Sequence, residues 1–78
     1  MNNFINNFVT NEFRHSLIIN EEEILNLNVF EEFLRNLKGF LRGDFINDNV
    51  YKIVFENINR EEFNKNSTLI NRILRRGI

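Results

Sequence analysis

The sequence has 78 residues, 42% hydrophobic and 27% charged, which suffices for one small globular domain and argues against a disordered tail. Without cysteine it has no disulfide framework and no thiolate metal site, and without a run of about 18 apolar residues it has no membrane-spanning helix. The net charge of −1 is segregated: residues 1–34 hold six acids and one base, whereas residues 35–78 hold nine bases and five acids. This segregation suggests a charged partner surface or self-association of opposite halves.

A first helix is expected over residues 2–16, capped by Asn2 or Asn3. Its apolar face is formed by Phe4, Ile5, Phe8, Val9 and Phe13. The same stretch lacks the basic start and continuous apolar core of a secretory signal, so a cytoplasmic location is expected.

The longest predicted element is an amphipathic helix from Asn20 to Gly43. Asn20 and Glu23 have the spacing of a capping box, and Gly43 suits a C-terminal cap. The apolar stripe follows alternating steps of three and four residues: Leu27, Phe30, Leu34, Leu37 and Leu41. An end or bend near Lys38 and a break at residues 26–28 are the alternatives.

Residues 43–49 contain the clearest turn signal, with Gly43, Asp44, Asn47, Asp48 and Asn49 in quick succession. The next segment, residues 50–58, fits either a helix or a strand. One helical face is matched by Val50, Tyr51, Val54, Phe55 and Ile58, whereas the β-branched and aromatic content favours a strand. We expect a helix, because the sequence offers no second convincing strand to pair with it.

Two further helical segments are predicted after residue 58. Asn59 and Glu62 form a second capping-box pattern, which begins a short helix or turn. Ser67 is expected to cap a last helix with inward Leu69, Ile70, Ile73 and Leu74. The expected fold is therefore all-α: a single domain over residues 1–78, in which a bundle of four to five helices packs around one long central helix. A homodimer through that helix is compatible with this fold.

The patterns of catalytic and metal sites are missing from the sequence. His15 is the only histidine, and residues 44–49 lack the ligand spacing of an EF-hand. His15 adjoins Ser16, but neighbours on a helix diverge by about 100° and do not pair. Three glycines form no phosphate-binding loop. We expect no enzymatic activity, no cofactor and no bound metal.

Two charged clusters are the candidate partner-binding residues. The basic cluster on one face of the last helix consists of Arg72, Arg75 and Arg76. It can bind carboxylates or phosphates, or only complement the helix C-terminus. The acidic cluster includes Glu22, Glu31 and Glu32. It can mimic a row of phosphates or only begin a helix.

These patterns favour a small non-enzymatic module that binds and modulates a partner protein, as is typical of viral, phage or plasmid accessory proteins. The alternative is DNA or RNA binding by the basic C-terminal helix, with residues 50–58, 60–66 and 68–76 arranged like a helix-turn-helix unit. An isoelectric point near 5.8 argues against that alternative.

Overall fold

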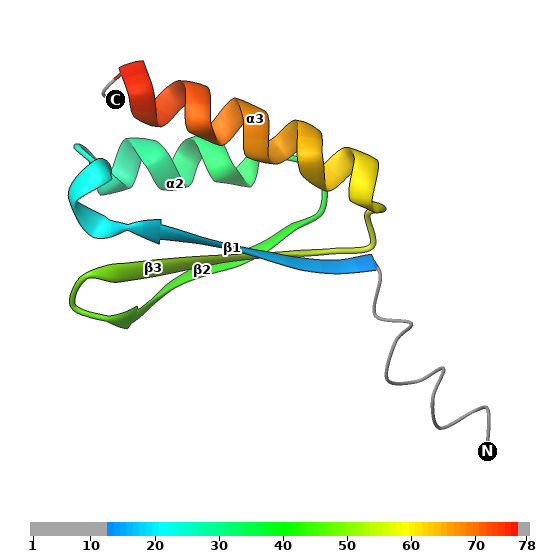
Figure 1. The fold of residues 1–78 in the computed structure, drawn as a ribbon, viewed down its shortest axis with the longest axis horizontal. Coiled ribbons are helices and arrows are strands. Elements are labelled where there is room, and N and C mark those ends of the chain that lie inside the picture. Colours follow the sequence, from blue (N-terminus) through cyan, green and yellow to red (C-terminus); the bar gives the residue numbers. More distant parts are fainter. Residues whose placement is uncertain (1–12, 77–78) are drawn as a thin grey trace.

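The computed structural model describes residues 13–76, and Figure 1 shows that they form two layers. In chain order the elements are β1 (Arg14–Asn20), the short 3₁₀ turn η2 (Glu21–Glu23), α2 (Leu27–Arg35), β2 (Phe40–Asn47), β3 (Val50–Glu56) and α3 (Arg60–Arg76). The strands form an antiparallel sheet in the order β1-β3-β2. Both helices lie on the same face of this sheet (Figure 1).

The prediction of an all-α helical bundle is wrong, because residues 50–58 are mainly the central strand of the sheet. Side chains along β3 alternate between the two faces of the sheet. Tyr51, Ile53 and Phe55 face the helices, and each is at most 1% exposed. The sequence favours a helix for this segment only because it offers no second convincing strand. In the structure, β1 is that second strand and pairs with β3.

Strand β1 occupies residues predicted to end the first helix and to link it to the next. Its register pairs Leu17 with Ile53 and Ile19 with Tyr51. Leu17 and Ile19 are two residues apart and therefore lie on the same face of a strand, where they join the core beneath the helices. Residues 2–12 of the predicted first helix lie outside the described residues.

The predicted helix from Asn20 to Gly43 is three separate elements. Only Leu27–Arg35 is α-helical, and the observed cap is Asn26, whose Oδ1 accepts a hydrogen bond from the Val29 N–H at 3.1 Å. The helix cannot continue into β2, because Gly39 has a left-handed backbone (φ +78°) that redirects the chain.

The apolar stripe of this segment is only partly confirmed. Phe30 and Leu34 are fully buried, whereas Leu41 is 45% exposed on β2. Gly43, the expected cap, lies within β2. The structure gives no support for a homodimer through a long apolar helix. The apolar face of α2 is already covered by the sheet and by α3 within one chain.

Residues 60–76 form one continuous helix in place of the two predicted segments. The Asn59 cap is confirmed, because its Oδ1 accepts a hydrogen bond from the Glu62 N–H at 2.9 Å. Ser67 is not a cap: it lies in mid-helix with its Oγ buried. The buried Asn66 side chain donates to the Lys38 carbonyl oxygen at 2.9 Å, which ties α3 to the turn between α2 and β2. Among the described residues, neither helix is long and apolar enough to cross a membrane.

Candidate functional site

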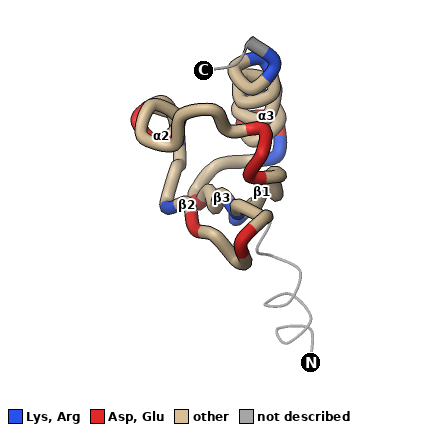
Figure 2. Tube along the Cα trace, turned by 90° about the vertical axis from the view of Figure 1, so that its left-hand side faces the viewer, with Lys and Arg blue, Asp and Glu red and all other residues tan. Residues whose placement is uncertain are grey.

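The candidate site is a cleft of about 470 Å³ between η2 and the C-terminal half of α3, called here the η2–α3 cleft. Its lining residues are Glu22, Glu23, Leu25, Asn71, Leu74 and Arg75. The acidic wall comes from η2 and the basic wall from α3. Figure 1 shows η2 on the side of the molecule where α3 ends, and Figure 2 shows its acidic residues between β1 and the connection to α2.

Both walls of the cleft are held by the core. On one side, the Glu21 N–H donates to the Asn49 carbonyl oxygen at 2.8 Å, and the next residue after η2, Ile24, is buried. On the other side, Ile70 is fully buried and fixes the rotation of α3. In this arrangement Arg75 and the η2 glutamates are exposed to solvent at the cleft.

The charged groups of the cleft have no ion-pair partner in the described part of the chain. The ion pairs found there are Arg14–Glu56, Arg35–Glu32, Lys38–Glu62 and Arg42–Asp44. Glu22, Glu23 and Arg75 belong to none of them. Leu25, at the same cleft, is 68% exposed, which is high for a large apolar side chain. The cleft therefore combines both signs of charge with an exposed apolar side chain.

A second hollow of about 430 Å³ continues along α3 and shares Asn71 and Arg75 with the cleft. Its other lining residues are Thr68 and Arg72. The structure thus brings three of the predicted binding residues, Glu22, Arg72 and Arg75, to one region. The side chain of Arg76 lies outside those that the structure describes.

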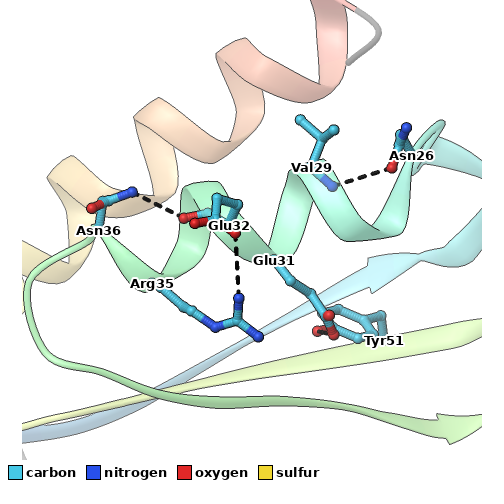
Figure 3. Close-up of polar contacts among 7 residues, drawn as sticks. All are labelled: Asn26, Val29, Glu31, Glu32, Arg35, Asn36 and Tyr51. Atoms are coloured by element: carbon cyan, nitrogen blue, oxygen red, sulfur yellow. Dashed lines mark hydrogen bonds and ion pairs between the residues drawn. The ribbon is translucent and has the colours of Figure 1, made fainter.

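The other two predicted binding residues lie on α2 (Figure 3) and do not line the cleft. Glu32 pairs with Arg35 at 3.5 Å on the exposed side of the helix. Glu31 points toward the sheet, where its Oε2 accepts a hydrogen bond from the Tyr51 hydroxyl at 3.0 Å. Glu31 therefore fastens α2 to β3 and is not part of a free acidic cluster.

The sequence places Glu23 in the acidic cluster with Glu22, but it does not identify Leu25 and Leu74 as site residues. Leu74 is expected from the sequence to face inward, and it lies half-buried at the edge of the core. The acidic run was interpreted as the first turn of a long helix, so its side chains were not expected opposite α3. Recognising β1 as a strand would have placed the run at the end of the sheet.

Burial and Glu31 together stabilise the neutral form of Tyr51. The ring is 1% exposed, and burial is the largest cause that raises the pKa of its phenol above the usual value of about 10. The hydrogen bond to Glu31 and the charge of that carboxylate raise the pKa further. A raised folded-state pKa gives stability that is present below the unfolded pKa and is lost as pH rises beyond it.

Glu31→Gln is expected to lower the pKa of Tyr51 without returning it to the ordinary value, because burial remains. The variant should also lose less of its free energy of unfolding than the wild type does as pH rises above about 10. Tyr51 is the only tyrosine and the chain has no tryptophan, so the ultraviolet absorbance of tyrosinate reports on this group alone. An unchanged titration midpoint in Glu31→Gln would contradict the role given to the carboxylate.

The described residues form neither a metal site nor a catalytic pair of His15 with Ser16. No three His, Asp or Glu side chains there are placed to hold a metal ion. His15 stacks on Phe63, with 4.7 Å between ring centroids. Ser16 points to the opposite face of β1, since adjacent strand residues alternate, so the two do not form a catalytic pair.

Comparisons with known proteins identify no relative of this chain. No protein-family model, curated protein or solved structure matches the chain. The charges and the exposed leucine of the η2–α3 cleft are therefore the features from which a function can be inferred.

Proposed function

We propose that this protein is a non-enzymatic module that binds another protein through the η2–α3 cleft. The observation that carries the proposal is the opposition of Glu22 and Glu23 to Arg75 across one cleft, without an ion-pair partner for any of them in the described part of the chain. Charges of both signs around an exposed leucine suit a protein segment that carries complementary charges beside an apolar side chain.

The size and composition of the chain support a more specific form of this proposal. A domain of 78 residues has room for a small core and one binding surface, as accessory proteins of viruses, phages or plasmids do. We further propose that the protein acts in the cytoplasm.

Arg75→Glu and Leu25→Asp are each expected to weaken partner binding about 30-fold or more, which corresponds to about 2 kcal/mol for a central interface residue. Both side chains are exposed, so the fold should persist. The measurement is affinity capture from cells of the source, followed by titration of the captured protein against each variant.

Lys65→Glu is the matched control for Arg75→Glu. It makes the same charge change on an exposed position of α3 that does not line the cleft. A partner that binds all three variants with unchanged affinity would contradict the cleft as the binding surface. Turnover of a small substrate, abolished by one point change, would contradict the non-enzymatic assignment.

Nucleic-acid binding is the second candidate, and the hollow on α3 is the observation that favours it. There Arg72 and Arg75 lie beside the hydrogen-bonding side chains of Thr68 and Asn71, a combination that contacts phosphates in many complexes. The helix-turn-helix arrangement itself is wrong, since residues 50–56 are a strand and residues 60–76 are one helix.

Glu22→Lys separates the two candidates. Phosphate binding by α3 should strengthen when an acidic group at the adjoining cleft becomes basic, and it should weaken steeply with salt. Protein binding across both walls of the cleft should weaken instead, because one wall loses its carboxylate. The readout is fluorescence anisotropy with a labelled oligonucleotide at low and high salt, beside the capture assay.

A further inference from the structure

The two edges of the sheet differ in how they are protected. Strand β2 pairs with β3 through two register shifts, which leave Leu41 and Ile46 as extra residues and interrupt the edge. Its exposed face also carries the Arg42–Asp44 ion pair. Bulges and charges of this kind hinder the addition of another strand. The β2 edge is therefore a poor site for strand pairing.

The β1 edge has no such protection among its described residues. All seven residues from Arg14 to Asn20 pair with β3 without a register shift. Arg14 is the one residue with a full formal charge at neutral pH in this strand. A regular edge strand with few charges is a template for another strand.

The ladder shows which backbone groups point outward from β1. The Glu21 N–H donates to the Asn49 carbonyl oxygen, immediately beyond the last strand pair, Asn20 and Val50. Hydrogen-bonded and non-hydrogen-bonded pairs alternate in an antiparallel ladder. The even-numbered residues Ser16, Ile18 and Asn20 therefore direct their N–H and C=O groups away from β3, to the edge where no described strand pairs.

We propose that β1 pairs antiparallel with β1 of a second copy of this chain, about a two-fold axis at Ile18, to form one continuous six-stranded sheet. In this register Ile18 lies opposite its own copy on the face without helices. The side chain is 55% exposed in a single copy, so pairing removes apolar surface from water. An axis of this kind makes the interface self-complementary.

Charge along the strand favours a second copy as the occupant of this edge. Arg14, which also pairs with Glu56 across the ladder at 3.3 Å, begins β1, and three consecutive glutamates, residues 21–23, follow the end of the strand. Antiparallel pairing brings the start of one strand beside the end of the other. Each Arg14 then lies near the acidic run of the partner copy, at both ends of the interface. A foreign strand has no such built-in match.

The test uses a charge swap at Ile18, measured on the purified protein alone by sedimentation equilibrium. The wild type should pass from one chain of 9.5 kDa to twice that mass as concentration rises. Ile18→Lys and Ile18→Glu should each remain at the mass of one chain, because like charges then lie opposite each other. An equimolar mixture of the two variants should recover the doubled mass, because opposite charges then face each other.

Ile46→Lys and Ile46→Glu are the matched controls, since Ile46 is 56% exposed on the other edge and should leave the dimer intact. A wild type that stays at the mass of one chain would overturn the proposal, even if it bound a foreign extended peptide. A dimer that survives both Ile18 variants, or one abolished by the Ile46 variants, would also overturn it. The assay contains no other protein, so its failure would leave the proposed function of the cleft unaffected.

Discussion

Phe55→Ala is expected to destabilise the protein by about 3–5 kcal/mol, because truncating a buried phenylalanine leaves a cavity and removes its packing. Phe55 is fully buried in the central strand, with its ring centroid 6.2 Å from that of Phe40 and 5.8 Å from that of Phe63. It therefore connects β2, β3 and α3 through one side chain. Folded domains of this length have about 4–12 kcal/mol of stability in total, so the variant should lose a large share of its stability and be close to unfolding only if the total lies at the low end of that range.

Phe45→Ala is the matched control for this prediction. Phe45 also lies on the helix-facing side of the sheet, but it is 46% exposed on the edge strand β2. Its truncation should therefore cost much less than that of Phe55. Denaturant unfolding followed by far-ultraviolet circular dichroism measures both free energies. Equal losses for the two variants would contradict the assignment of Phe55 to the centre of the core.

Gly43→Ala is expected to destabilise the protein by about 1–3 kcal/mol, which is typical of overpacking in a core. In a strand with ordinary backbone angles, alanine in place of glycine normally stabilises, by about 0.4–1 kcal/mol, through the unfolded state. Here an added Cβ would collide with the Tyr51 hydroxyl oxygen and would lie only about 2.7 Å from the Tyr51 Cζ. The steric conflict should reverse the sign of the effect.

A double-mutant cycle with Tyr51→Phe tests this mechanism. Removing the hydroxyl removes the nearest of the atoms in conflict but leaves the ring carbons, so Gly43→Ala should cost less in the Tyr51→Phe background without becoming neutral. The cycle is measured by denaturant unfolding of the four proteins. Additive free energies would show that the cost of Gly43→Ala does not come from contact with the Tyr51 hydroxyl.

The sequence predicts several residues of the candidate site, but it does not predict how they are arranged in space. Charge type and spacing identified Glu22, Arg72 and Arg75, which come together at the cleft and the adjoining hollow. The same reasoning included Glu31 and Glu32, which α2 directs elsewhere. Which charges share a surface depends on how distant segments pack, and a list of charges does not contain that information.

The local signals of the sequence determined the short-range features of this protein. The Asn59 cap, the core positions of Phe30 and Leu34, and the inward position of Ile70 each depend on residues within a turn or two. Tertiary structure decided that residues 14–20 are a strand, and it selected the strand for residues 50–56, whose sequence fits either a helix or a strand. A strand has no hydrogen bonds of its own, so Ile53 becomes part of a sheet only when Leu17, 36 positions earlier, lies opposite it.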